Sequence, residues 1–297
     1  MNENGKHTSP VAALAAVYPQ LYLTPGEEGA LAYGPIVRQG QDAPGHSLAH
    51  FRGSPQDSLT LENTPAGPVQ IITLGDRQDF ETFLRIMAYR CAVKEIPATQ
   101  GASILDGVIN WTKIRAHKEV YLAEGGDVNG WQGEFRRFTA DPRNFKDALI
   151  VLSVGPYSAL PAADAGLSES EWLAASHLIR KAHECTHFIC RRLFPELIDP
   201  IWDELIADAV GLYAAFGRYD RALAGRLLGV TAEGYAGGRL ENYAGDDDLN
   251  ALARKVYKTL AHLEGRATEA GSIPAYEMAL RLEAEHSFWQ KQRHSEE

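Results

Sequence analysis

The chain has 297 residues, of which 45% are hydrophobic and 23% are charged, the composition of an ordinary globular protein with a sizeable core. Its formal net charge is −10, so we expect neither nucleic acid nor an anionic membrane surface as a partner, because both attract cationic proteins. No apolar run is long enough for a transmembrane helix, and three cysteines fit a reducing compartment, so we expect a cytoplasmic protein.

The first half of the chain is expected to combine loops with a few short elements. Residues 1–68 contain many Gly, Pro and Ser and are predicted to be an irregular N-terminal segment. Apolar runs at 69–74 and 148–154 predict strands, and the second fits either a buried central strand or a peptide-binding sheet edge. Helical spacing of apolar residues predicts a helix over 76–94, whereas residues 99–135 fit either strand or helix.

The second half of the chain is predicted to be mainly helical. Ser168 and Glu171 have the spacing of a capping box and begin a long helix that ends near Leu193. A second long helix is expected over 197–216, because Gly217 follows its last turn. Shorter helices are expected at 219–228, 248–264 and 275–292. Strands early in the chain and helices late predict an α+β fold.

The first long helix contains the motif H-E-x-x-H at residues 183–187. His183 and His187 are four residues apart, so both imidazoles lie on one helix face and can bind the same metal ion. Glu184 lies beside that face, where it can accept a proton from a water activated by the metal. The motif therefore predicts a zinc site with Glu184 as its catalytic base.

A catalytic zinc ion usually takes three protein ligands, so a third ligand is needed. The metzincin pattern is excluded, because it would place Gly at Cys190 and His at Leu193. Glu204 lies on the next predicted helix, which can fold back antiparallel to the first and bring its carboxylate to the histidines. Asp208, one turn later, can accept a hydrogen bond from the second ring nitrogen of a ligating histidine.

The motif H-E-x-x-H followed by E-x-x-x-D on the next helix resembles the gluzincin branch of zinc metallopeptidases, the thermolysin-like arrangement. The resemblance covers about residues 183–208. It implies His183, His187 and Glu204 as zinc ligands and Glu184 as the base and proton shuttle. It also implies that Asp208 supports a histidine, with His183 as the expected partner.

The resemblance implies a zincin-like fold, with a small N-terminal sheet region followed by a mainly helical half that carries the metal-site helix. We therefore expect one catalytic domain over 69–297, with a possible sub-boundary near 155–167, after the irregular segment 1–68. Two positions depart from the thermolysin-like pattern. Asp203 stands where those enzymes have Asn, and Lys181 is charged where an uncharged residue is usual.

Hydrolysis of a peptide bond also needs a group that stabilises the negative oxygen of the tetrahedral intermediate. In gluzincins this group is a His or Tyr that follows the third ligand. The candidates in this stretch are Tyr235, Arg239, Tyr243 and His262. We favour Arg239 and Tyr243, because they are four residues apart and follow two glycines that would let the backbone approach a ligand.

Two cysteines lie in the metal-site helix, and their spacing keeps the α-carbons of Cys185 and Cys190 too far apart for a disulfide. Packing is the expected role of both, although Cys190 lies near enough to the histidine face to be a thiolate ligand.

The sequence therefore predicts a zinc-dependent hydrolase, a metallopeptidase that cleaves a peptide or small amide-containing substrate. Two alternatives stay open. The same two histidines and carboxylate describe a non-haem Fe(II) centre of a tailoring or oxidative enzyme. A structural metal with a closed fourth position is the other alternative.

Overall fold

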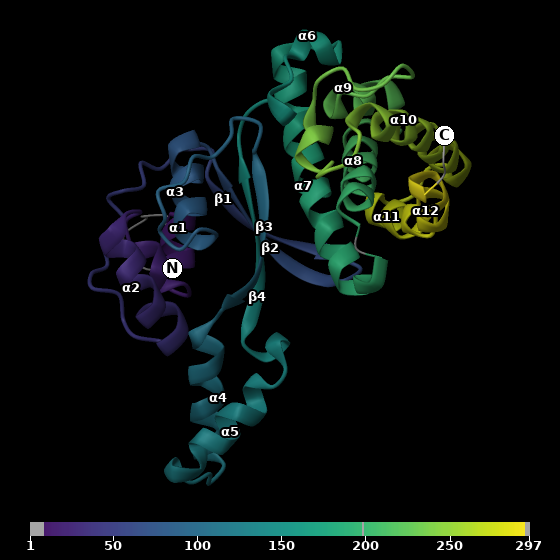
Figure 1. Cartoon of the computed structure of the whole chain (residues 1–297). Coiled ribbons are helices and arrows are strands. Elements are labelled where there is room, and N and C mark those ends of the chain that lie inside the picture. Colours follow the sequence, from purple (N-terminus) through teal and green to yellow (C-terminus); the bar gives the residue numbers. More distant parts are fainter. Residues whose placement is uncertain (1–8, 198, 295–297) are drawn as a thin grey trace. The chain divides into compact units, whose positions relative to one another are not determined.

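The computed structural model describes residues 9–197 and 199–294, and contacts within the chain divide it into two compact units (Figure 1). The described residues of the first unit are 9–61, 70–96 and 104–153. Those of the second unit are 62–69, 97–103 and 154–294.

The first unit begins with short helices: α1 (Pro10–Ala15), a 3₁₀ turn at Pro19–Tyr22 and α2 (Glu27–Gln39). The prediction of an irregular segment over 1–68 is therefore wrong for residues 9–68, and residues 1–8 lie outside the described part of the chain. Proline and glycine serve here to begin and end helices, since Pro10 opens α1 and Gly40 ends α2 with a φ of 69°. Buried apolar side chains then hold these short helices in the core: Val11, Leu14, Leu21 and Ile36.

A four-stranded sheet has the order β1-β2-β4-β3, with bounds Ser58–Thr64, Gly67–Leu74, Lys146–Ser153 and Ala102–Ile109 in that order. β2 runs parallel to β4, with Gln70 opposite Leu149. The predicted boundary between residues 68 and 69 is wrong, because it falls inside β2. β4 is a central strand, and its residues 149–152 are fully buried, so the strand expected at 148–154 does not supply a sheet edge.

Three helices complete the first unit: α3 (Arg77–Met87), α4 (Trp111–Ala123) and α5 (Trp131–Thr139). The carboxylate of Asp76 caps the start of α3 by accepting hydrogen bonds from two backbone N–H groups. The helix ends seven residues earlier than the predicted 76–94. Residues 88–91 turn out of helical geometry there, with Arg90 and Cys91 both at positive φ.

The second unit is helical and carries the predicted metal-site residues. Its helices are α6 (Ala162–Ala165), α7 (Glu169–Leu193), α8 (Pro200–Phe216), α9 (Arg221–Leu228), α10 (Leu249–Ala270), α11 (Ala275–Glu283) and α12 (His286–His294). The capping box at Ser168 and Glu171 is confirmed, and Gly217 ends α8 with a φ of 69°. The single helix predicted over 275–292 is instead two helices.

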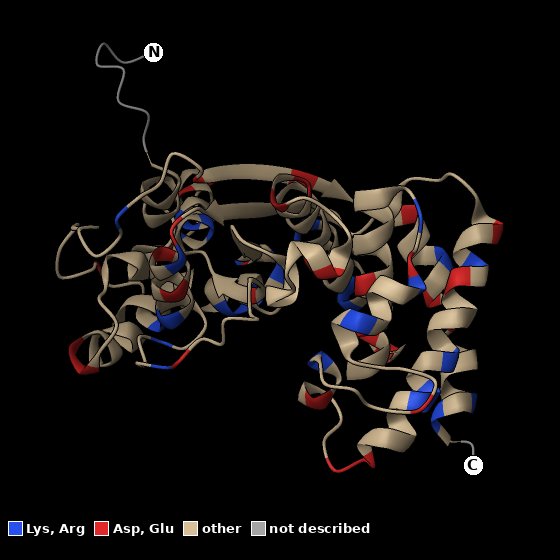
Figure 2. Ribbon diagram, turned by 90° about the horizontal axis from the view of Figure 1, so that it is seen from above, with Lys and Arg blue, Asp and Glu red and all other residues tan. Residues whose placement is uncertain are grey.

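The fold class is confirmed as α+β, with a small sheet and a mostly helical remainder. Acidic and basic residues alternate along the helices in Figure 2, so the excess negative charge is spread over many elements. Within the described residues, no helix is both long and apolar enough to cross a membrane.

Glu283 at the end of α11 is a buried acid that gives a test of this packing. Its Oε2 accepts a hydrogen bond from the Trp202 indole at 3.0 Å and lies 4.0 Å from Cys190 Sγ. Burial raises the pKa of Glu283 to about 7. Because the unfolded chain already ionises this group near pH 4.3, ionisation destabilises the fold as pH rises from about 4.3 to 7.

We therefore expect Glu283→Gln to raise the free energy of unfolding at pH 8 by about 1–3 kcal/mol, with a smaller difference at pH 5. Urea unfolding of both proteins at the two pH values measures this. A difference that is the same at both pH values would contradict the assignment of a buried, protonatable Glu283.

Candidate metal centre

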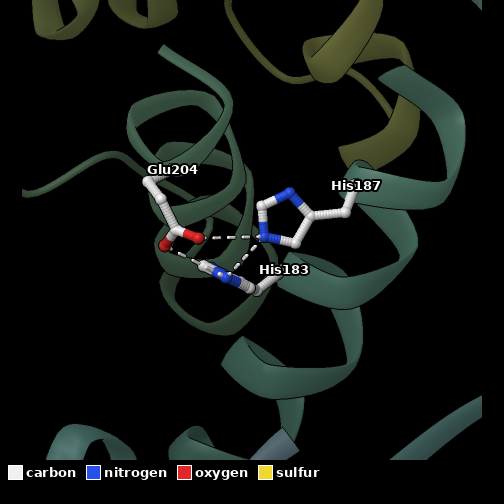
Figure 3. A group of neighbouring side chains, drawn as sticks. All are labelled: His183, His187 and Glu204. Carbon is white, nitrogen blue, oxygen red and sulfur yellow. Dashed lines mark hydrogen bonds and ion pairs between the residues drawn. The ribbon is translucent and has the colours of Figure 1, made fainter. Parts of the chain in front are cut away.

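The centre is formed where α7 and α8 pack side by side (Figure 1). The two helices approach closely at Gly211, where a Cβ atom would lie only 3.0 Å from the Ile179 side chain. His183 and His187 lie on the face of α7 that is turned toward α8 and are both buried. Glu204 projects from α8 toward them (Figure 3). The predicted antiparallel return of the second helix thus brings the third ligand to the histidine pair.

The side-chain atoms of these three residues converge on one place. The two Nε2 atoms of His183 and His187 are 3.0 Å apart. Glu204 Oε1 lies 3.4 Å from His187 Nε2, and Glu204 Oε2 lies 3.6 Å from His183 Nε2. Ligands at zinc–nitrogen and zinc–oxygen bond lengths around one tetrahedral ion are about 3.3 Å apart. The spacing therefore fits three ligands of a single metal ion.

The outer nitrogen of each histidine faces a carboxylate. His183 Nδ1 lies 3.1 Å from Asp208 Oδ1, and His187 Nδ1 lies 2.8 Å from Asp203 Oδ2. A neutral imidazole that donates from Nδ1 presents a lone pair at Nε2. Two lone pairs then face each other beside Glu204. Oε2 of Glu204 is buried and has no hydrogen-bond partner among the described residues. A cation between these acceptors would satisfy all of them.

The charges around the centre also favour a divalent cation. Three carboxylates lie within 4 Å of the two histidines, those of Asp203, Glu204 and Asp208, and a fourth belongs to Glu184, which follows His183 directly in the chain. Arg239 pairs with Asp208, and Arg191 lies 3.8 Å from Asp203. With both histidines neutral, two negative charges are left without a partner, which is the charge that a divalent ion would balance.

The neighbouring charges shift the protonation of the site residues. Burial opposes the ionised form of Glu204, but hydrogen bonding and charge from the two histidines and Arg239 outweigh it and lower the pKa to about 2. Burial likewise opposes the ionised form of Asp208, and the Arg239 guanidinium holds its pKa well below the usual range. Both carboxylates are therefore anionic near neutral pH, as metal ligation and support require.

For His187, burial disfavours the imidazolium, but Asp203 and Glu204 outweigh it and raise the pKa well above the ordinary value in the absence of a cation. A metal ion would therefore displace a proton here.

Glu184 differs from the other carboxylates of the centre. Glu184 is buried, with an exposed fraction of 7%. Among the described residues, 9–197 and 199–294, none forms a hydrogen bond or ion pair with its carboxylate. A buried carboxylate without a structural partner is available to take a proton.

The two favoured candidates for stabilising the tetrahedral oxygen occupy different environments. Arg239 is buried and engaged, because its guanidinium pairs with Asp208 and lies 3.3 Å from the Tyr157 hydroxyl. Tyr243 is half-buried. Burial and the charge of Glu204 raise the pKa of Tyr243, so its hydroxyl stays protonated and can donate. Arg239 also lies 3.9 Å from Glu204, but its guanidinium is engaged by Asp208 and Tyr157.

The other sequence candidates lie apart from the metal group. Tyr235 donates its hydroxyl to the Gly238 carbonyl, and His262 pairs with Glu285. Cys185 and Cys190 are buried free thiols and do not belong to the metal group, in agreement with their expected packing role.

Sequence reasoning missed two residues that the structure brings to the centre. Asp203, at a position that departs from the thermolysin-like pattern, lies 2.8 Å from His187 Nδ1. Its position directly before Glu204 was the available signal. Tyr157, whose hydroxyl donates to Asp208 at 2.7 Å, begins a short 3₁₀ turn, Tyr157–Ala159, where no periodic spacing reveals it.

The chain belongs to DUF7005, a family of unknown function that matches residues 3–276. No curated protein and no solved structure matches the chain. The metal-site helix and its partner lie inside the matched range, so the centre is part of the region that defines the family.

We expect the protein to bind one divalent metal ion per chain and to lose it in His187→Ala. Saturation with Zn²⁺ at about 1,000 times Kd should raise the free energy of unfolding by about 4 kcal/mol, because only the folded state assembles the ligands. Elemental analysis after gel filtration and thermal unfolding with and without chelator measure both effects.

The matched control is His177→Ala, which removes a histidine from the same helix outside the metal group. Equal metal content in the two variants would contradict the assignment of His187 as a ligand.

Proposed function

We propose that this protein is a zinc-dependent hydrolase that cleaves a peptide or amide bond. The observation that carries the proposal is the combination of three residues spaced as metal ligands with a buried, unpartnered carboxylate on Glu184, the residue that follows His183 in α7. Three protein ligands are the usual number at catalytic zinc, whereas a structural zinc site commonly has four.

His183, His187 and Glu204 would hold the ion. When bound, a metal ion there supplies a Lewis acid that polarises a carbonyl and lowers the pKa of water. Glu184 takes the proton from the attacking water and passes it to the leaving amine. The Tyr243 hydroxyl donates to the oxygen that becomes negative in the tetrahedral intermediate. Asp208 and Asp203 keep the Nδ1 protons on the two histidines, so that both Nε2 lone pairs remain available.

An extended peptide is the substrate that the surroundings favour. Lys181, one turn before Glu184 on α7, forms an ion pair of 3.2 Å with Glu62 of β1. Tyr276 also donates to Glu62, at 2.9 Å. Because β1 is an outer strand of the sheet, its free N–H and C=O groups near Glu62 offer a template for an extended peptide beside the helix that carries Glu184.

The two alternatives predict other features. A closed structural site would have a fourth protein ligand, but Cys190 Sγ faces Glu283 rather than the histidines, and no fourth His, Cys, Asp or Glu among the described residues joins the group. An Fe(II) centre would use the same three ligands but has no need of a free base at Glu184. Iron in the purified protein, with oxygen-dependent turnover, would favour that alternative.

We expect Glu184→Gln to retain bound zinc and to lower kcat by about 10²- to 10⁴-fold, because the amide cannot accept the proton. Cleavage of a quenched fluorescent peptide library by the zinc-loaded protein measures turnover, and elemental analysis measures retained metal.

Glu169→Gln is the matched control, since Glu169 is an exposed residue in the first turn of the same helix. Unchanged turnover in Glu184→Gln would overturn the mechanism. Wild-type protein that binds zinc but cleaves no peptide in the library would overturn the proposed peptidase activity.

A further inference from the structure

Asp208 is the most completely engaged carboxylate of the metal centre. It is 1% exposed, and three donors surround it. Its Oδ1 lies 2.7 Å from the Tyr157 hydroxyl and 3.1 Å from His183 Nδ1, while Oδ2 accepts from Arg239. Arg239 also reaches the Tyr157 hydroxyl, at 3.3 Å. The three residues therefore form a closed set of contacts around the carboxylate that orients His183.

Tyr157 is held in place by α7 itself. Its backbone N–H donates to Ser176 Oγ at 2.8 Å. Arg180 donates to the carbonyls of Gly155 and Pro156, at 2.7 and 2.6 Å. These bonds hold the two residues that directly precede Tyr157. The two residues after it, Ser158 and Ala159, both adopt a positive φ, of 53° and 58°.

Positive φ in consecutive residues other than glycine is costly and persists only where the surrounding structure imposes it. The backbone is therefore strained directly after Tyr157, the residue whose hydroxyl donates to Asp208.

The second histidine is supported differently. Asp203, which faces His187, has a 15% exposed side chain, and its nearest arginine, Arg191, is 40% exposed and 3.8 Å away. An exposed pair of this kind contributes little to the orientation of its members. The buried contacts are therefore concentrated on the His183 side of the centre.

We propose that Tyr157 and Arg239 are positioning residues for the metal centre, which fix the ring orientation and Nδ1 proton of His183: Arg239 acts through Asp208, and Tyr157 acts both through Asp208 and directly, since its hydroxyl lies 3.0 Å from His183 Nδ1. The inference rests on the proposed metal site. It assigns Arg239 a role different from the stabilisation of a substrate oxygen, because its guanidinium is used by Asp208 and Tyr157.

Whether removal of Arg239 weakens or strengthens metal binding distinguishes a positioning role from a purely electrostatic effect of its charge. Arg239 is positive and lies 3.9 Å from Glu204, so removing its charge would strengthen cation binding if only through-space attraction mattered. If Arg239 instead positions Asp208 and His183, its removal weakens binding. Removal of a residue that supports a metal ligand typically lowers affinity by about 10- to 100-fold.

The experiment measures the Kd for Zn²⁺ of the full chain by competition with a chelating dye. We expect Arg239→Gln to raise Kd by about 10- to 100-fold, and Tyr157→Phe by about 10-fold. Arg239→Lys keeps the charge but loses the two-pronged contact, so its Kd should fall between those of the wild type and Arg239→Gln. The visible absorption spectrum of the Co²⁺-loaded protein should shift in Tyr157→Phe, because the ring of His183 is free to turn.

Arg191→Gln is the matched control and should leave Kd within threefold of the wild type or lower it. Tighter or unchanged binding in both Arg239→Gln and Tyr157→Phe would overturn the positioning role. Should Arg239→Gln fail to fold, Tyr157→Phe, which keeps the buried ring, decides the question alone. A wild-type protein that binds no Zn²⁺ refutes the metal site itself, whereas normal binding without hydrolysis refutes only the proposed activity.

Discussion

The second unit is organised around a buried convergence of two imidazoles and a carboxylate. Two imidazole nitrogens and the carboxylate of Glu204 meet within 3.0 to 3.6 Å, and the outer nitrogens of the imidazoles lie 2.8 Å from Asp203 and 3.1 Å from Asp208. Without a cation, Asp203 and Glu204 outweigh burial and raise the pKa of His187, so that a proton on His187 balances part of this charge. A divalent ion would take the place of that proton and could bind all three groups.

The packing of α7 against α8 positions the three candidate ligands. The two helices approach closely at Gly211, and the αL turn at Gly217 ends α8. Both helices contribute fully buried side chains to one hydrophobic cluster, among them Trp172 of α7 and Trp202 of α8. This pair sets the positions of both histidines and Glu204, whereas Tyr157, Arg239 and Tyr243 belong to two short 3₁₀ turns, at Tyr157–Ala159 and Arg239–Asn242, the second of which Tyr243 caps. The structure thus combines a helical scaffold for the metal with turn residues that orient and complete it.

The sequence alone was sufficient to predict those site residues that are spaced four apart on a helix. His183, His187, Glu204 and Asp208 are related by i, i+4 spacing on two capped helices, so their meeting could be deduced. Tyr157 could not be found in this way, because its place depends on contacts with Ser176 and Arg180 rather than on any repeat.

In the N-terminal region, composition was misleading for a similar reason. Gly and Pro mark turns, but in residues 9–40 they begin and end helices that tertiary packing stabilises.

The most direct test of the account is the crystal structure of the zinc-loaded protein with anomalous data collected at the zinc edge. The account predicts one strong peak about 2.0–2.2 Å from His183 Nε2, His187 Nε2 and a Glu204 carboxylate oxygen, with a fourth position open to solvent or substrate. A zinc-loaded crystal with no peak at these atoms, or with a fourth protein ligand that closes the site, would contradict it.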